Sequence, residues 1–414
     1  MKRALLTRYS LYIQALTIPV LLSLQGAGCK DTGNPGTPGD TLTAVYYNID
    51  KFCQGNDLSV VNQVEEHGGA YADSGIAGDP FTILRNHGAN LVRLRLWHNP
   101  QWTKEVYGAS GTKLYNDLAD VEAGMLRAKQ NNMEVCLDIH YSDTWADAGN
   151  QEVPAAWAEI KNLDILKDSV YNYTYKVLNY LKGKGLLPYM VQLGNEINCG
   201  ICYSGIQTGF PNLNCCNNHW ADFGSVINSA IKAVRDVSAG QGKSVKIALH
   251  IADPGNAEWF FDQLISEGAV NDFDVIGYSY YPLWHTSVKL SNISYVTGRL
   301  REKFSKEVMI LETAYPWTTD GNDNYTNLLG GQAAFAGYPY TPEGQLSLMK
   351  ALAQEVIDGG GRGIVYWEPA WITSQMKDLW GTGSSWENAT FFDFSGNTLP
   401  AINYMNYPYT FPAK

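Results

Sequence analysis

Two glutamates stand where a carboxylate is unusual, directly after apolar runs. Glu196 ends the stretch "VQLGNE" and Glu312 ends the stretch "VMILE". Two carboxyl groups across a pocket are the minimum machinery for breaking a glycosidic bond, because one protonates the leaving oxygen while the other attacks the anomeric carbon or activates water. The donor must stay protonated and its partner ionised, so the two need different surroundings. The pair therefore indicates glycoside hydrolysis, provided that the fold brings both side chains together.

Residues of suitable type accompany this pair. Asn195, next to Glu196, could bind a sugar hydroxyl beside the reacting carbon. Arg93 could keep a nucleophilic Glu312 ionised, and the hydroxyl of Tyr280 or Tyr281 could donate a hydrogen bond to it. The alternative for either glutamate is a structural salt bridge. Two further carboxylates compete for the same roles, Asp138 and Glu368.

The elements that must position these groups recur along the chain as short β-rich runs separated by helix-like segments. Most runs are rich in Val, Ile and Leu, as strands buried on both faces must be. Eight β/α units predict a (β/α)8 barrel. An open, doubly wound sheet is the alternative, but it would need a glycine-rich phosphate turn after its first strand, and none is present. The expected strands are 44–50, 90–97, 134–141, 189–196, 245–251, 274–281, 307–315 and 363–371, with helices at 117–132, 221–237 and 342–360.

The expected strands also share a polar ending. In a (β/α)8 barrel the carboxyl ends of all strands meet at one mouth, where active sites form. Residues from distant parts of the sequence would therefore surround one cleft. These strand-end groups are Arg93 and Arg95, His140 with Asp143, Asn195 with Glu196, His250, Tyr280 with Tyr281, Glu312, and Trp367 with Glu368.

Length and composition agree with one barrel and exclude one class of partner. The chain has 414 residues, of which 45% are hydrophobic and 17% charged, with a formal net charge of −11. Nucleic-acid binding is disfavoured, because it needs a basic surface. The 12 Trp and 26 Tyr could stack on pyranose rings, or could simply fill the core of a large barrel.

The N-terminus has the features of a targeting segment. A positive region with Lys2 and Arg3 precedes a mostly apolar stretch and the small residues before Cys29. We predict a signal peptide at 1–28, a lipid-modified Cys29 and a Gly/Pro-rich tether through residue 42 before the barrel at 43–414. This would make the protein a lipoprotein anchored at the cell surface, with a plain secreted or periplasmic enzyme as the alternative.

Four of the seven cysteines crowd into one stretch, Cys199, Cys202, Cys215 and Cys216. An exported protein meets an oxidising compartment, so a disulfide in this loop is favoured over free thiols or a zinc site. Cys136 lies in an apolar strand and is expected to be buried, and Cys53 to stay free.

Longer motifs along the chain are specific enough to identify relatives. They are "GAYADSGIAGDPFTILRNHGANLVRLRLWHNP" (69–100), "LDIHYSDTWADAGNQEVPAAW" (137–157), "QLGNEIN" (192–198), "GYSYYPLWH" (277–285), "ILETAYPWT" (310–318), "VYWEPAWI" (365–372) and "GSSWENATFFDF" (383–394). With these motifs the chain resembles the endo-β-1,4-galactanases of glycoside hydrolase family 53 over approximately residues 43–410. The resemblance implies a retaining hydrolase of β-1,4-galactan in which Glu196 is the acid/base and Glu312 the nucleophile. A mannanase or glucanase of the same clan and a non-catalytic glycan-binding lipoprotein are the alternatives, and we expect a monomer.

Substrate contacts are expected from side chains at or just past the strand ends. Tryptophans there could form platforms for sugar rings, and polar groups could bind hydroxyls. The candidate platforms are Trp97, Trp145, Trp284, Trp367 and Trp371, and the polar candidates are Arg93, His140, Ser142, Asp143, Asp147, Asn195, Tyr280 and His285.

The resemblance also implies a calcium site between the loops after the seventh and eighth strands. Calcium takes six to eight oxygen ligands from carboxylates, amides and carbonyls. Asp323, Tyr325 and Asn327 would provide them from one loop, and Ser384 and Glu387 from the other. Glu387 stands where relatives have Asp, so its longer side chain shifts the carboxylate. The alternative is an ordinary Asp/Asn-rich turn. No cofactor is needed for the chemistry itself.

Overall fold

The structure is a computed structural model that describes residues 43–242 and 244–412. The predicted signal peptide, Cys29 and tether lie outside these described residues and stay predictions. Within the described part of the chain, no helix is both long and apolar enough to cross a bilayer.

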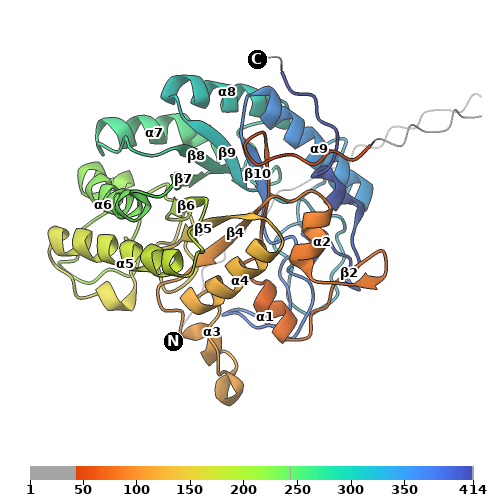
Figure 1. The fold of residues 1–414 in the computed structure, drawn as a ribbon, viewed down its shortest axis with the longest axis horizontal. Coiled ribbons are helices and arrows are strands. Elements are labelled where there is room, and N and C mark those ends of the chain that lie inside the picture. Colours follow the sequence, from red (N-terminus) through yellow and green to blue (C-terminus); the bar gives the residue numbers. More distant parts are fainter. Residues whose placement is uncertain (1–42, 243, 413–414) are drawn as a thin grey trace, which may run out of the picture. The chain divides into compact units, whose positions relative to one another are not determined.

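Eight parallel strands close into a barrel, as the sequence predicts (Figure 1). Each strand pairs with its neighbour in chain order, and β1 closes the ring against β10, with Cys53 opposite Gly363. A small hairpin of β2 (Ala72–Asp73) and β3 (Ile76–Ala77) lies outside the ring. The barrel strands are β1 (Cys53–Asp57), β4 (Leu91–Leu96), β5 (Glu134–Ile139), β6 (Met190–Leu193), β7 (Lys246–Ala252), β8 (Val275–Ser279), β9 (Glu307–Glu312) and β10 (Gly363–Tyr366).

The first strand was predicted wrongly at residues 44–50. That segment is not a strand, and its Tyr47 packs against Tyr409 and Phe411. The true β1 has the sequence "CQGND", which lacks the apolar character expected of a buried strand. Its polar side chains are nevertheless fully buried: Asp57 pairs with Arg93 inside the barrel, and Asn56 donates to the sulfur of Met405.

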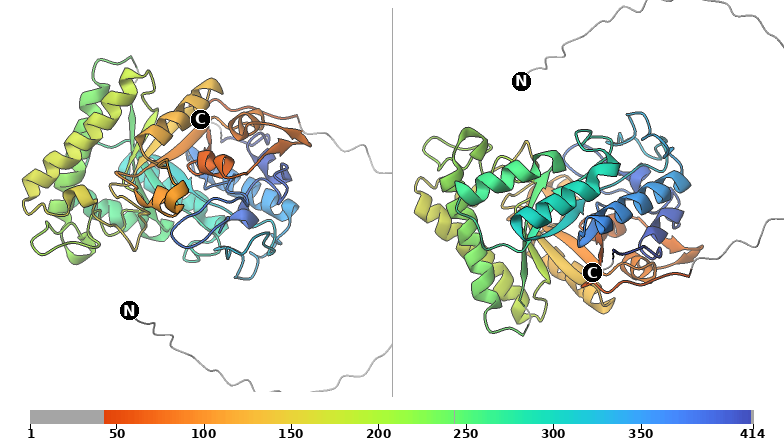
Figure 2. Two further views of the ribbon diagram at one scale, coloured as in Figure 1. Left: turned by 90° about the horizontal axis from the view of Figure 1, so that it is seen from below. Right: turned by 90° about the horizontal axis from the view of Figure 1, so that it is seen from above.

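Helices surround the ring, as Figure 2 shows from two sides. Several begin at side-chain caps that satisfy otherwise unpaired N–H groups, with Asp79, Asp117, Asn162 and Thr341 as cap residues. The three predicted helices correspond to α4, α6 and α9. The helices are α1 (Val61–Glu66), α2 (Pro80–Asn86), α3 (Trp102–Glu105), α4 (Leu118–Gln130), α5 (Leu163–Gly183), α6 (Trp220–Ser238), α7 (Ala257–Ser266), α8 (Ile293–Phe304) and α9 (Pro342–Asp358).

The backbone changes direction sharply where three strands end. Tyr141, Glu196 and Glu368 follow β5, β6 and β10 and adopt positive φ angles of 53°, 46° and 47°. Non-glycine residues adopt such angles at a cost, and they concentrate at functional sites. The turns re-aim the side chains at the carboxyl ends of the strands, where the barrel mouth lies.

Candidate active site

Glu196 and Glu312 line the same cleft at the barrel mouth, which has a volume of about 340 Å³. Glu312 is the last residue of β9 and is buried, with 6% of its surface exposed. Glu196 comes three residues after β6 and stays partly exposed. The remaining cleft residues are Arg93, Arg95, His140, Trp145, Ala146, Asp147, Ala148, Asn195, Ala252, Tyr281, Trp284, His285, Leu328, Trp367 and Trp386.

Glu312 is surrounded by groups that favour its charged form. The Arg93 guanidinium lies 2.9 Å from its Oε1, and the hydroxyl of Tyr281 donates a hydrogen bond of 2.9 Å to its Oε2. A cation and a donated hydrogen bond both stabilise a carboxylate. These contacts suit an ionised nucleophile.

Glu196 has a different set of neighbours. The hydroxyl of Ser279 lies 2.5 Å from Oε1, and the backbone N–H of Ala148 donates to Oε2 over 3.3 Å. Among the residues that the structure describes, no lysine or arginine forms an ion pair with Glu196. Its surroundings therefore stabilise a charge less strongly than those of Glu312.

Both glutamates have raised pKa values, and burial is the main cause. The pKa of Glu312 rises from 4.5 to about 8, because burial and the nearby charges of Glu196 and Asp57 outweigh the lowering effect of Arg93. The pKa of Glu196 is raised by burial as well. Since the two carboxyls interact, they share their protons as a pair. With one proton on the pair, the contacts of Arg93 and Tyr281 favour the charge on Glu312 and leave the proton on Glu196.

Arg93 organises the floor of the cleft as the centre of a buried ion cluster. Its guanidinium contacts Asp57 at 2.7 Å and Asp138 at 2.8 Å, in addition to Glu312. Burial alone would raise the pKa of Asp138, but Arg93 and His140 lower it below its usual value. One guanidinium therefore faces three carboxylates, which explains why Arg93 does not fully offset the burial of Glu312.

Asn195 is fixed by this cluster. Its Oδ1 accepts a hydrogen bond of 2.8 Å from Arg93, and its Nδ2 donates to the carbonyl of Ala146. The predicted placement of Asn195, Arg93, His140, Trp145, Asp147, His285 and Trp367 around one cleft agrees with the structure.

Tyr280 does not contact the nucleophile candidate, and this prediction needs correction. Its hydroxyl donates to the carbonyl of Val288, away from the cleft, whereas Tyr281 contacts Glu312. The reason is the alternation of side chains along this segment. The hydroxyls of Tyr278 and Tyr280 bond to Thr297 of α8 and to the carbonyl of Val288, away from the cleft. Ser279 and Tyr281 lie on the opposite face and contact Glu196 and Glu312.

Three other predicted contacts do not line the cleft. The carboxylate of Asp143 accepts hydrogen bonds from the backbone N–H groups of Asn99 and Ala155, so it holds its loop together. Ser142 is buried and accepts from the N–H of Thr144. Trp371 is buried, with its ring parallel to that of Trp145 at 6.4 Å, so it supports the cleft tryptophan from behind.

Arg95, expected at the mouth as a strand-end group, lines the cleft and stacks on the ring of Trp145 at 4.0 Å. Some residues of the site escaped the sequence analysis. Trp386 lies in an irregular segment far from any strand, and its Nε1 donates to the carbonyl of Trp367. Ser279 contacts Glu196, and its place just before Tyr280 and Tyr281 at a strand end was the one available signal. Trp97, a predicted platform, is instead 1% exposed and belongs to the core.

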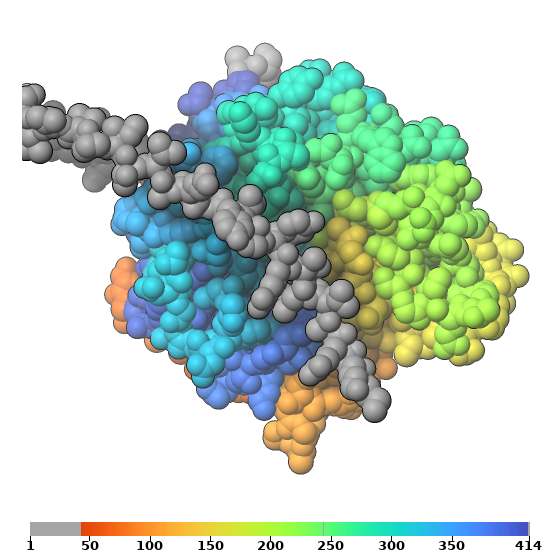
Figure 3. All heavy atoms as spheres, turned by 180° about the vertical axis from the view of Figure 1, so that it is seen from behind, coloured from red at the N-terminus to blue at the C-terminus, as the bar shows by residue number. Residues whose placement is uncertain are grey.

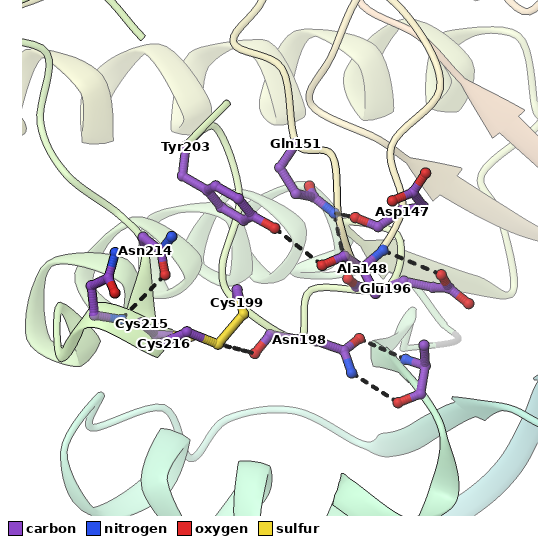
Figure 4. Close-up of a disulfide and its surroundings, with 12 residues drawn as sticks. Asp147, Ala148, Gln151, Glu196, Asn198, Cys199, Tyr203, Asn214, Cys215 and Cys216 are labelled. Atoms are coloured by element: carbon purple, nitrogen blue, oxygen red, sulfur yellow. Dashed lines mark hydrogen bonds between the residues drawn. A yellow bond between two sulfur atoms is a disulfide. The ribbon is translucent and has the colours of Figure 1, made fainter. Parts of the chain in front are cut away.

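The cysteine-rich stretch contains one disulfide, between Cys199 and Cys216 (Figure 4). The prediction of a disulfide is thus confirmed for one pair. Cys202 and Cys215 are free and buried, as are Cys53 and Cys136.

The five residues proposed for calcium lie at two adjoining loops, which appear side by side as cyan and blue segments in Figure 3. Asp323 accepts hydrogen bonds from the N–H groups of Tyr325 and Ser384, and Glu387 accepts from Asn322 and Thr373. The buried Oδ1 of Asn327 has no hydrogen-bond partner. Oxygen ligands of the type that calcium prefers are therefore present. Among the described residues no cluster of three or more His, Cys, Asp or Glu could hold a metal, so backbone carbonyls would have to complete the site.

Comparison with known proteins agrees with this geometry. The profile of glycosyl hydrolase family 53 matches residues 53–405. The chain is 42% identical over 367 residues to the arabinogalactan endo-beta-1,4-galactanase of Cellvibrio japonicus, covering 88% of this chain and 93% of that protein. It is 31% identical to the endo-beta-1,4-galactanase of Bacillus subtilis, covering 86% of each. The solved GH53 catalytic domain of Ignisphaera aggregans superimposes with a TM-score of 0.76 at 33% identity, over 89% of this chain and 99% of that one. The chain belongs to glycosyl hydrolase family 53.

Proposed function

We propose that this protein is a retaining endo-β-1,4-galactanase that cleaves the galactan chains of type I arabinogalactan. The observation that carries the proposal is the asymmetric pair of glutamates in one cleft: Glu312 forms an ion pair with Arg93, whereas Glu196 forms none with the described lysines and arginines. The substrate is supported by the galactanases among its relatives, including the Cellvibrio japonicus enzyme.

The chemistry follows from the two environments. Glu196 donates its proton to the leaving glycosidic oxygen while ionised Glu312 attacks the anomeric carbon, which gives a glycosyl ester. Glu196, now a carboxylate, then takes a proton from water as the water attacks that carbon and releases Glu312. Arg93 and Tyr281 hold Glu312 in place and stabilise its charge before attack.

The walls of the cleft offer contacts for a galactan chain. Trp145, Trp284 and Trp367 present aromatic surface, and Trp284 is 40% exposed. Asp147 and His285 are the polar groups beside them. Aromatic rings fit the apolar faces of galactose, while polar groups distinguish its axial hydroxyl.

Product analysis tests the proposal directly. β-1,4-Galactan, mannan and carboxymethyl-cellulose are incubated side by side with the enzyme, and the first products are followed by NMR. We expect galacto-oligosaccharides that first appear as the β-anomer, from galactan alone. Faster cleavage of mannan or cellulose would contradict the substrate assignment, and a first product of α-configuration would contradict the retaining mechanism.

The two adjacent tyrosines provide a matched pair of variants. Tyr281→Phe removes the hydrogen bond to Glu312, and a hydrogen bond to a charged group contributes about 1.5–3 kcal/mol. We therefore expect kcat on galactan to fall by about ten- to a hundredfold. Tyr280→Phe removes a bond to a carbonyl outside the cleft and should keep kcat within about twofold of wild type. Equal losses in the two variants would remove Tyr281 from its role.

Calcium binding between the two loops is a further part of the proposal. Asp323, Asn327 and Glu387 would hold the ion with their side-chain oxygens, and it would brace the loops near Glu312 and Trp367. We expect the thermal midpoint to rise when millimolar calcium replaces chelator, because a ligand bound only to the folded state stabilises it. An Asp323→Ala variant should lose this response. An unchanged wild-type midpoint, with no calcium found by elemental analysis, would eliminate the site.

A further inference from the structure

The disulfide loop, residues 199–216, lies directly beside Glu196 in the chain and in space (Figure 4). The Cys199–Cys216 disulfide closes its base, and the N–H of Cys215 donates to the carbonyl of Cys199 over 3.0 Å. Asn198, just before the loop, exchanges two hydrogen bonds with the backbone of Ala252. The loop is thus fixed at its base to the end of β7.

The loop reaches across to the β5–α5 loop, residues 140–162, through two neighbouring residues. The hydroxyl of Tyr203 donates to the carbonyl of Ala148 over 3.1 Å. Ser204 accepts from the N–H of Gln151 through its hydroxyl oxygen at 2.9 Å, and its own N–H donates to the carbonyl of Gln151 over 3.0 Å. We call Tyr203 and Ser204 the bracket.

The bracket holds a buried side chain that reaches the centre of the site. Gln151 is 1% exposed, and its Nε2 donates to the carbonyls of Asp147 at 2.9 Å and Asn195 at 2.7 Å. The Asp147 carbonyl and the Ala148 N–H belong to the same peptide group. A hydrogen bond accepted by the carbonyl polarises that group and strengthens its N–H as a donor.

That N–H is the one that contacts Glu196. Its distance to Oε2 is 3.3 Å, near the upper limit for a hydrogen bond, so a small displacement of the β5–α5 loop would break it. The other donor to this carboxyl is the Ser279 hydroxyl.

The titratable and charged groups that face Glu196 come from several elements. They are Asp147 from the β5–α5 loop, Arg93 from β4, His250 from β7, Tyr281 after β8 and Glu312 from β9.

We propose that Tyr203 and Ser204, anchored by the Cys199–Cys216 disulfide, are positioning residues that hold the Ala148 amide against the Glu196 carboxyl. The inference rests on the proposed role of Glu196 as acid and base. The amide favours the carboxylate form, which is the form that activates water in the second half of the reaction. The disulfide loop thereby supports the step in which the glycosyl ester is hydrolysed.

A single-atom variant tests the bracket. The Ala148 N–H lowers the pKa of Glu196, so weakening its contact should raise that pKa. In Tyr203→Phe we expect the alkaline limb of the kcat/KM profile to move to higher pH by about half a unit. Complete loss of a hydrogen bond to a charged group would shift it by roughly one to two units, and this variant should only weaken the bond. kcat should fall while KM for galactan stays unchanged or falls.

Tyr340→Phe is the matched control, because Tyr340 also donates its hydroxyl to a loop carbonyl, that of Gln332, outside the cleft. It should leave the pH profile unchanged. If Tyr203→Phe has the thermal midpoint of this control and the pH profile of wild type, the bracket has no positioning role and the proposal is overturned.

The disulfide provides a second test of the proposal. Treating the folded enzyme with a reductant, or replacing both cysteines (Cys199→Ser with Cys216→Ser), should shift the profile in the same direction as Tyr203→Phe. In a Tyr203→Phe background the reductant should add no further shift. Two results would contradict the idea that the disulfide acts through Tyr203. One is a full additional shift when the Tyr203→Phe variant is reduced, and the other is an unshifted pH profile in wild type after the disulfide is confirmed to be reduced.

A titration without substrate separates this inference from the proposed function. The carboxyl of Glu196 is followed by infrared difference spectroscopy in Glu312→Gln, and its band is identified by its absence in Glu196→Gln with Glu312→Gln. Adding Tyr203→Phe should raise the titration midpoint. The proposed function fails if wild-type enzyme releases no oligosaccharide from galactan, whereas the bracket fails if this midpoint does not move.

Discussion

Glu312→Gln is expected to lose nearly all activity on galactan, at least several thousandfold, because a neutral amide cannot attack the anomeric carbon to form the glycosyl ester. Glu196→Gln should lose about 10²- to 10⁴-fold, the usual contribution of a general acid or base. The two variants should also differ in which step of the reaction they block.

An activated aryl galactoside needs no protonation of its leaving group. Glu196→Gln should therefore release the first equivalent of phenol rapidly and then stall at the glycosyl ester. Glu312→Gln cannot form this ester and should show no burst of phenol.

Azide distinguishes the roles further, since it can replace the water that Glu196 activates. With Glu196→Ala it should restore turnover and give a β-galactosyl azide, and with Glu312→Ala it should give the α-azide by direct displacement. The reverse pattern would exchange the two assignments. Wild-type turnover in either Gln variant would remove that residue from the mechanism.

The Glu312→Gln variant should remain folded, and its stability should depend on pH in a defined direction. Glu312 and Glu196 titrate as a pair, and burial raises the pKa of both, that of Glu312 to about 8 from an ordinary value of 4.5. The last proton of the pair, which resides on Glu196 while Glu312 is ionised, is therefore bound more tightly in the folded state. The stability that this proton contributes below pH 4.5 is lost as the pH rises to 8, and the variant, with one carboxyl of the pair removed, loses less of it. The stability of the variant relative to wild type should increase between pH 5 and pH 8, measured by urea unfolding.

Arg93→Met is expected to have the largest effect on stability. It leaves Asp57, Asp138 and Glu312 buried without a cation, and breaking a buried ion pair in this way costs about 3–5 kcal/mol. The free energy of unfolding is measured with urea at pH 7. The loss should shrink as the pH falls toward 4, because without Arg93 the pKa of buried Asp138 is no longer held down and Glu312 can also be neutral in the folded state.

Arg127→Met serves as the control for Arg93. Arg127 also pairs with two carboxylates, but Glu65 and Asp79 are 32% and 41% exposed, so solvent screens these pairs and they should contribute about 1 kcal/mol. Arg93→Lys retains the charge but not the planar donor geometry, so it should lie between wild type and Arg93→Met. If the free energy of unfolding of Arg93→Met is no lower than that of Arg127→Met, the buried ion cluster does not stabilise the fold more than the Arg127 pairs do.

The sequence predicted the barrel and most of the cleft because both depend on local patterns. Apolar runs mark seven of the eight strands within a few residues, and the polar groups at their ends meet because parallel strands share an edge. The exception, β1, failed for a physical reason, since its polar residues are buried and Asp57 pairs with Arg93 inside the barrel, which no hydropathy pattern reveals.

What could not be predicted depends on long-range geometry. Tyr280 and Tyr281 lie on opposite faces at the end of β8, and which face points into the barrel mouth follows from the packing of the strand in the ring. Trp386 reaches the cleft from an irregular segment, and Ala148 contributes only a backbone N–H, which has no signature in the sequence. The choice of Cys199 and Cys216 among four cysteines was likewise open until the loop was folded.

The origin of each group at the barrel mouth has a consequence for how this protein can diversify. The charged centre is built from strands, with Asp57, Arg93, Asp138 and Glu312 on β1, β4, β5 and β9. The side chains along the cleft walls, such as Asp147 and His285, come from loops. Exchange of the loops that carry Asp147 and His285 should therefore change which polysaccharide is accepted while the nucleophile and its ion cluster are inherited intact. Glu196, three residues past β6, depends on loop contacts as well, so such an exchange would also alter the acid/base.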